Sequence, residues 1–262
     1  MTKVYAFVNQ KGGVGKTTTT ISLAAMFARL GQRVLMVDLD PQANATSCLG
    51  VDKRNVQRGT YEVLIGSCTP VAAILKNEQL GLSLIPSSPN LTGAEIELIG
   101  EEGRETKLRD ALAGILPSYD YILVDSPPSL GILPLNALVA ADDGAIIPVQ
   151  CEYLALEGLS QLTQTVSRVR SSFNPRLDIR GVVMTMFDGR TNLGNQVIEE
   201  VRSHFPGKVF SSVIPRSIRL AEAPSHGIPI SVYAPSSIGA LAYQELAEEI
   251  LRSDRARIHT KG

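Results

Sequence analysis

A glycine-rich segment at residues 9–17 reads Asn-Gln-Lys-Gly-Gly-Val-Gly-Lys-Thr. Three of its glycines can adopt positive φ angles and let backbone N–H groups approach the oxygens of a polyphosphate. Lys16 would place a positive charge on the β and γ phosphates, and the Thr17 hydroxyl would be a ligand for Mg²⁺. Gln10 stands where such loops normally have their first glycine. The segment predicts a loop that binds a nucleoside triphosphate together with Mg²⁺.

Acidic residues follow two further apolar runs. Residues 121–124 lead into Asp125, and a carboxylate at the end of a central strand can reach the Mg²⁺ shell. Asp38 and Asp40 end the second run, and the alternation of a strand puts them on one side. A carboxylate there can orient the water that attacks the γ-phosphate. The alternative for Asp40 is a plain Asp-Pro turn.

These residues need a sheet that brings the ends of several strands together. Strand-like apolar runs alternate with segments of helical periodicity, which is typical of a mainly parallel sheet with helices on both faces. Strands are predicted at 4–8, 33–37, 82–86, 121–124, 145–149, 181–186 and 209–214. Helices are predicted at 16–30, 107–116, 133–141, 157–173, 193–204 and 238–252. We expect one doubly wound α/β domain over residues 1–252 and a short basic tail over residues 253–262.

Composition limits the function without deciding it. A chain of 262 residues with 44% apolar content can bury a sizeable core. The net charge of −1 gives no overall attraction to nucleic acid, so any such binding needs a local patch. The three cysteines are far apart and fit a reduced compartment. The first apolar run stops at Asn9, which is too short for a signal peptide, so a cytoplasmic protein is expected.

Three segments carry a resemblance when they are taken together. They are Lys-Gly-Gly-Val-Gly-Lys-Thr at 11–17, Val-Asp-Leu-Asp-Pro-Gln-Ala-Asn at 37–44 and Leu-Val-Asp-Ser-Pro-Pro at 123–128. They resemble the nucleotide motifs of the ParA/MinD deviant-Walker ATPases, a class of P-loop NTPases. Segments 188–194 and 214–227 are similar to the Soj branch, the chromosome-partitioning ATPases. The resemblance runs from about residue 3 to about residue 250.

The resemblance implies ATP and Mg²⁺ as cofactors, slow ATP hydrolysis and an ATP-dependent homodimer. Lys11 would reach across this sandwich dimer to the phosphates held by the other subunit, as an arginine finger does in trans. Asp40 would position the hydrolytic water, and Asp38 and Asp125 would support Mg²⁺. The predicted nucleotide-binding residues are Lys11, Gly12, Gly13, Val14, Gly15, Lys16, Thr17, Thr18, Pro215 and Ser217, the last two near adenine.

The ATP dimer of this family resembles a clamp on double-stranded DNA without sequence preference. Arg190 and Arg219 match its DNA-contact arginines, and loop arginines suit contacts to phosphates. The alternative is a solvated surface or an ion pair with Glu222. The resemblance further implies a ParB-like partner that stimulates hydrolysis, and association with the nucleoid.

Other functions on the same motifs remain as alternatives. A MinD-like membrane ATPase would need an amphipathic C-terminal helix, and the tail offers only Ile258, so no membrane partner is expected. A nitrogenase-type reductase would need a cysteine soon after Asp125, and none occurs before Cys151. A ParA-like ATPase that positions another cargo, such as a carboxysome or a chemoreceptor array, stays open. So does a biosynthetic ATP-dependent ligase.

Overall fold

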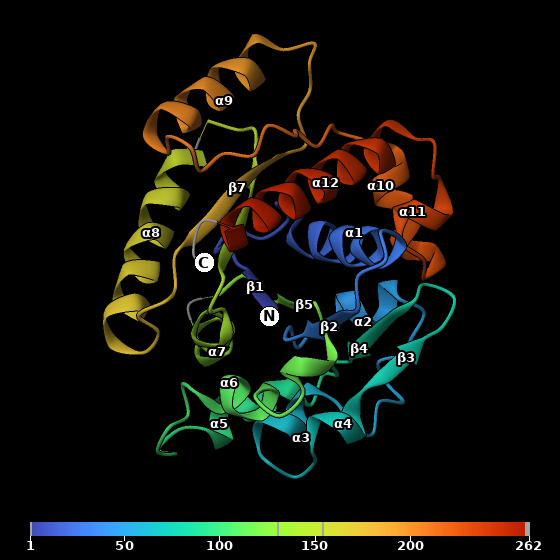
Figure 1. The fold of residues 1–262 in the computed structure, drawn as a ribbon, viewed down its shortest axis with the longest axis vertical. Helices are drawn as coiled ribbons and strands as arrows, with labels where there is room; N and C mark the ends of the chain where they lie inside the picture. Colours follow the sequence, from blue (N-terminus) through green and yellow to red (C-terminus); the bar gives the residue numbers. More distant parts are fainter. Residues whose placement is uncertain (1, 130, 154, 260–262) are drawn as a thin grey trace.

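A mainly parallel sheet forms the centre of the computed structural model, which describes residues 2–129, 131–153 and 155–259 (Figure 1). Its strands are β1 (Lys3–Phe7), β2 (Val34–Asp38), β3 (Leu75–Asn77), β4 (Leu82–Ile85), β5 (Tyr121–Asp125), β6 (Gly144–Gln150) and β7 (Ile179–Thr185). Their order across the seven-stranded sheet is β3-β4-β2-β5-β1-β6-β7. Among the strands of the described residues, only the β3–β4 pair is antiparallel. The predicted doubly wound α/β class is confirmed.

Helices cover both faces of this sheet (Figure 1). The longer ones are α1 (Lys16–Arg29), α7 (Ile132–Ala140), α8 (Ala155–Ser172), α9 (Asn192–His204) and α12 (Ile238–His259). The shorter ones are α2 (Asn44–Cys48), α3 (Thr60–Leu64), α4 (Pro70–Ala73), α5 (Leu91–Glu97), α6 (Lys107–Leu112), α10 (Ile218–Glu222), α11 (Ile230–Tyr233) and the 3₁₀ turns η1 (Leu116–Ser118) and η2 (Ala223–His226). Helices α1 and α12 pack on one face of the sheet and form one hydrophobic core with it. Helices α3 and α5 to α9 pack on the opposite face and form the second core.

The strand predicted at 209–214 is wrong as a continuous strand. Val209 forms one isolated bridge with Val182, and the Ile214 N–H donates to the Met184 carbonyl. Between these points the Ser211 and Ser212 N–H groups donate instead to the Glu249 carboxylate of α12, at 2.7 and 3.0 Å. A side chain from the covering helix therefore interrupts the ladder along β7.

Several boundaries also differ from the sequence expectation. The helix predicted at 107–116 stops at Leu112 and is followed by η1, because Gly114 and Pro117 do not continue an α-helix. At the C-terminus, α12 passes through residue 252, where we expected the domain to end, and continues to His259. The last three residues of the expected tail, 260–262, lie outside the described residues.

A buried ion pair explains why α12 stays docked beyond residue 252. The Asp254 carboxylate accepts hydrogen bonds from the Tyr5 hydroxyl at 2.8 Å, the Tyr121 hydroxyl at 3.1 Å and the Arg180 guanidinium at 3.1 Å. The Arg180 and Asp254 side chains are only 4% and 3% exposed. The last part of α12 is thereby tied to the middle of β1 and to the amino ends of β5 and β7.

Asp254→Ala should lower the free energy of unfolding by about 3–5 kcal/mol, because it leaves the buried Arg180 charge without its partner. Urea unfolding followed by circular dichroism measures this change. Glu248→Gln is the control, since it removes only the exposed pair between Glu248 and Arg252 on the same helix and should cost less than about 1 kcal/mol. Equal effects from the two variants would refute a structural role for the Asp254 network.

Candidate functional site

The glycine-rich loop lies at the carboxyl edge of the sheet, between the end of β1 and the start of α1. Gly15 caps the helix in the left-handed region with φ of 82°, a conformation that favours glycine. The Thr185 hydroxyl, at the end of β7, donates to the Val14 carbonyl at 2.8 Å and fixes the loop to the sheet. The N–H groups at the start of α1 thus face the point where a phosphate would bind.

Side chains from α1 and β5 meet at this loop, as the sequence predicted. The Thr17 hydroxyl donates to Asp125 Oδ2 at 2.7 Å, and Lys16 is buried beside the same carboxylate. The Thr20 hydroxyl donates to Asp125 Oδ1 at 3.0 Å. Sequence reasoning did not single out Thr20, although it stands close to one helical turn after Thr17 and therefore on the same face. Helix α1 therefore donates a hydrogen bond to each of the two carboxylate oxygens of Asp125.

This donor set fits Mg²⁺, which prefers hydroxyl and carboxylate oxygens. Asp125 and Asp38 are register partners on neighbouring strands, and both are fully buried. Burial raises the pKa of Asp125 to about 6, against the lowering effect of Lys16. Burial and the nearby Asp125 raise the pKa of Asp38 to about 7. Two buried carboxylates side by side favour a bound cation, because it relieves both the desolvation and the mutual repulsion.

Asp38 is engaged with its own loop in this structure. Its Oδ2 accepts hydrogen bonds from the Thr46 N–H at 2.8 Å and the Thr46 hydroxyl at 2.7 Å, and its Oδ1 accepts from the Asp40 N–H at 3.2 Å. These bonds give Asp38 a positioning role for the segment that carries Asp40. Its predicted contribution to Mg²⁺ stays a prediction.

Asp40 lies just beyond β2 and is 5% exposed. Its Oδ1 accepts the Gln42 N–H at 2.8 Å, which is the hydrogen bond of an Asx turn. Its backbone carbonyl accepts the Ser87 hydroxyl at 2.7 Å. The Asp-Pro turn that was the alternative interpretation of Asp40 therefore exists. Because this turn also orients the Asp40 carboxylate, it is compatible with the predicted catalytic role.

Lys11 differs from Lys16 in direction and in exposure. Its ammonium forms an ion pair of 2.6 Å with Glu152, which follows the end of β6, and the two side chains are 49% and 46% exposed. Asn9 shapes this part of the loop, since its Oδ1 accepts the Lys11 N–H at 3.0 Å and its amide donates to the Pro148 carbonyl at 2.7 Å. No sequence signal pointed to Glu152, because it lies 141 positions away.

The predicted DNA-contact arginines lie on the surface, and each is paired with an acid. The Arg190 guanidinium donates to both carboxylate oxygens of Asp188, at 2.9 and 2.6 Å, and this hydrogen bonding holds the pKa of Asp188 well below its usual range. Arg219 donates to Glu222 at 2.9 Å, the ion pair weighed as an alternative. Their role toward DNA stays a prediction.

The residues predicted near adenine lie on the connection between α9 and α10. Pro215 forms an isolated bridge with Phe187, and Ser217 is the residue that precedes α10. Their role toward a nucleotide stays a prediction.

Comparison with known proteins bears on this site. A family model described as an AAA domain matches residues 2–179. Sporulation initiation inhibitor protein Soj of Bacillus subtilis is 52% identical over 250 residues, which cover 95% of this chain and 98% of that protein. Chromosome-partitioning ATPase Soj of Thermus thermophilus is 53% identical over 246 residues, or 94% of each chain. This chain belongs to the ParA/Soj family. The resemblance predicted from the motifs is confirmed.

Solved structures of similar fold include nucleotide complexes. One with a TM-score of 0.86 and 39% identity is cobyrinic acid a,c-diamide synthase from Mycobacterium smegmatis with bound ADP and magnesium, with 97% of this chain and 96% of that chain covered. A Borrelia burgdorferi putative plasmid partition protein bound to AMPPNP has a TM-score of 0.81 with 97% and 100% covered, and at 24% identity it shows the fold alone. The diamide synthase, solved with ADP or an ATP analogue and magnesium, supports ATP and Mg²⁺ as the ligands of the ParA/Soj site described above.

No helix within residues 2–129, 131–153 and 155–259 of this ParA/Soj family member is both long and apolar enough to cross a membrane.

Proposed function

We propose that this chain is a DNA-partitioning ATPase whose ATP-bound form is a sandwich homodimer that binds DNA without sequence preference and is released when a ParB-like partner stimulates hydrolysis. The observation that carries the proposal is the contrast between the two lysines of one loop. Lys16 is buried beside Asp125, whereas the Lys11 ammonium is half exposed and is paired with Glu152 away from that carboxylate. A second cation held outside its own phosphate site is suited to serve a neighbouring subunit.

The proposed cycle assigns one step to each of the site residues. ATP and Mg²⁺ would bind at Lys16, Thr17 and Asp125, and the γ-phosphate would give the partner's counterpart of Lys11 an anion to bind. Dimerisation would double every DNA contact, and binding to DNA rises steeply with the number of phosphates neutralised. A water that Asp40 positions would then hydrolyse ATP and remove the γ-phosphate. The contact between this phosphate and Lys11 of the other subunit would be lost, and the dimer would dissociate. Such ATP-driven binding and release would associate the protein with the nucleoid.

The Lys11–Glu152 pair would compete with dimerisation in this cycle. We expect Glu152→Gln to lower the dissociation constant of the AMPPNP-bound dimer about threefold, because an exposed ion pair contributes less than about 1 kcal/mol. Sedimentation over a concentration series measures the change. Glu101→Gln, which removes the partner of Lys107 in another exposed pair, should leave the dimer unchanged. A weaker dimer from Glu152→Gln would show that Glu152 stabilises the interface instead.

DNA binding is proposed for Arg190, in the turn before α9, and for Arg219, in the short helix α10, and both side chains are exposed. The combined Arg190→Glu, Arg219→Glu variant should bind duplex DNA at least about tenfold more weakly and lower the salt slope by roughly four in a dimer. Fluorescence anisotropy with AMPPNP over a salt series measures both.

A matched control for this prediction comes from another surface turn. Arg54 pairs with Asp52 as Arg190 does with Asp188, with similar exposure of 83% against 86%. Arg54→Glu should leave DNA affinity within about twofold. If it weakens binding as much as the double variant, the loss reflects overall charge and the proposed patch is wrong.

The alternative enzyme class has one observation in its favour, the likeness to the diamide synthase structure at 39% identity. A ligase would consume ATP only together with a small-molecule acid and an amine donor. The partitioning proposal instead expects slow ATP hydrolysis that duplex DNA and a ParB-like protein accelerate together. Steady-state ATPase assays with each addition, alone and combined, distinguish the two. Insensitivity to DNA and partner would contradict the partitioning proposal.

The cargo is a separate question within this proposal. The relatives named chromosome partitioning protein ParA, such as that of Caulobacter vibrioides at 48% identity over 257 residues, favour DNA as the cargo. A carboxysome or chemoreceptor array would use the same ATP cycle with a different partner.

A further inference from the structure

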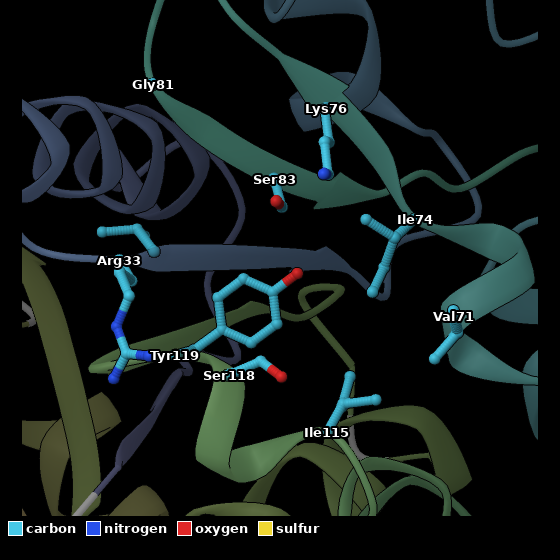
Figure 2. A pocket seen from close by; sticks show the side chains of 10 residues that line it. Arg33, Val71, Ile74, Lys76, Gly81, Ser83, Ile115, Ser118 and Tyr119 are labelled. Atoms are coloured by element: carbon cyan, nitrogen blue, oxygen red, sulfur yellow. The ribbon is translucent and has the colours of Figure 1, made fainter.

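A cavity of about 490 Å³ lies at the edge of the sheet opposite the nucleotide loop (Figure 2). It is bounded by the first residue of β2, by Ser83 of β4, by α4 and β3, and by the segment around η1. These are the amino ends of parallel strands, whereas Asp38, Asp125 and the glycine-rich loop lie at the carboxyl ends. The cavity is therefore separate from the ATP site.

Polar side chains face this cavity from one row of register partners across the sheet, in which the other members are buried and apolar. Lys76 of β3 pairs with Ser83 of β4, Ser83 pairs with Leu35 of β2, and Leu35 pairs with Ile122 of β5. Register partners point to the same face of a sheet. Leu35 and Ile122 belong to the hydrophobic core beneath the helices on this face of the sheet. Ser83 and Lys76 are the next two residues in the same row of register partners, and they lie beyond those helices.

Three of these polar groups converge. In Figure 2 the Lys76 ammonium and the Ser83 hydroxyl point into the cavity from above, and the Tyr119 hydroxyl points toward them from below. Within the described part of the chain none of the three has a hydrogen-bond or ion-pair partner. Arg33 also lines the cavity, but its guanidinium is occupied by Asp120 at 2.8 Å. Lys76 is thus the cation of the cavity that is available to a ligand.

One side of the wall is apolar. Ile74, Ile115 and Val71 line the side away from Arg33, whereas the ring of Tyr119 lies nearer to Arg33 and Ser118 adds a further polar group (Figure 2). An apolar wall with a few convergent polar groups is the usual composition of a small-molecule site, and the volume lies within the usual range. One ammonium with two hydroxyls matches the charge and the acceptor oxygens of a single carboxylate.

We propose that this cavity binds an organic carboxylate with an apolar body. The carboxylate lies between Lys76, Ser83 and Tyr119, and the apolar body packs on Ile74 and Ile115. A free small acid and the C-terminal residue of a peptide share this chemistry. The site is independent of the ATP cycle, so its occupancy leaves the proposed partitioning function untouched.

The experiment is a titration of the ¹⁵N-labelled full chain with 3-phenylpropionate, in the presence of Mg²⁺ and ADP so that the phosphate loop is occupied. Saturable shifts of the Val34, Lys76, Ser83 and Tyr119 amide signals are expected below about 10 mM. Lys76→Met should weaken binding about tenfold, as should use of the neutral 3-phenylpropanamide with the unmodified chain. Lys107→Met, at a lysine outside the cavity, should leave the affinity unchanged.

A second arm separates the two sources of the carboxylate. N-acetyl-glycyl-phenylalanine binding more tightly than 3-phenylpropionate assigns the site to a peptide end, and the reverse order assigns it to a free acid. Three results would overturn the proposal: no saturable shifts at these amides, equal affinity for the acid and its amide, or equal affinity of the Lys76→Met and unmodified chains. Because ATP turnover is not the readout, failure here says nothing against the partitioning proposal.

Discussion

With Lys11 replaced by alanine, the protein should remain monomeric in ATP and Mg²⁺, with a dimer dissociation constant raised at least about thirtyfold. The physical reason is that a cation contacting a buried phosphate across an interface contributes about 2–5 kcal/mol or more. Among the described residues, the Lys11 side chain is hydrogen-bonded to neither Asp125 nor Thr17, and its ammonium forms the exposed pair with Glu152. Its removal should therefore leave the nucleotide site of a single subunit intact.

The measurement is sedimentation or light scattering with AMPPNP, together with the affinity of the monomer for a fluorescent ATP analogue. Nucleotide affinity of the monomer should change less than about threefold, because Lys16, Thr17 and the loop N–H groups remain. Lys107→Ala is the control, since it removes an exposed, ion-paired lysine elsewhere. Normal dimer formation by Lys11→Ala would exclude the role across subunits.

Alanine in place of Asp40 should slow ATP hydrolysis about 100-fold or more while ATP binding and dimerisation persist, because a carboxylate that orients or deprotonates the attacking water contributes about 10²–10⁴ in rate. The structure supports this role through placement. Asp40 follows the strand next to β5, its N–H is bonded to Asp38, and the Ser87 hydroxyl holds its carbonyl. These bonds fix the backbone, and the Gln42 N–H engages one carboxylate oxygen, Oδ1, which leaves Oδ2 for the water.

Single-turnover hydrolysis measures the chemical step for Asp40→Ala, and sedimentation with ATP measures the dimer. The trapped ATP dimer should also remain on DNA longer than the unmodified protein. Asp52→Ala is the control, an exposed loop acid paired with Arg54. Turnover within about threefold of normal would move the water-positioning role to another group.

The sequence predicted the parts of the fold and site that depend on local patterns. The glycine loop, the apolar strands and the acids that end them are local signals, and parallel strands bring their carboxyl ends together. The patterns predicted Thr17 and Asp125 separately as Mg²⁺ ligands, and the structure joins the two side chains by a hydrogen bond. The resemblance then assigned the family, which the comparisons confirmed.

Features that depend on long-range contacts could not be predicted in this way. Glu249 interrupts the expected strand at 209–214 from a helix whose packing no local pattern reveals. Helix α12 continues through Asp254 because this residue bonds to the buried Arg180 and Tyr5 side chains. Both partners are more than 70 positions away in the sequence. Short elements were missed because β3 has 3 residues and α4 has 4, too few for a periodic pattern.

Mixing two defective variants tests most directly the claim that Lys11 acts on the ATP of the other subunit. Lys11→Ala keeps Asp40, and Asp40→Ala keeps Lys11. In a mixed dimer the nucleotide on the Lys11→Ala subunit has its own Lys16 and Asp40 and receives Lys11 from the partner. One complete site then forms only if Lys11 acts in trans. We predict that the mixture hydrolyses ATP well above the sum of the two variants alone; a rate no higher than that sum would contradict the account.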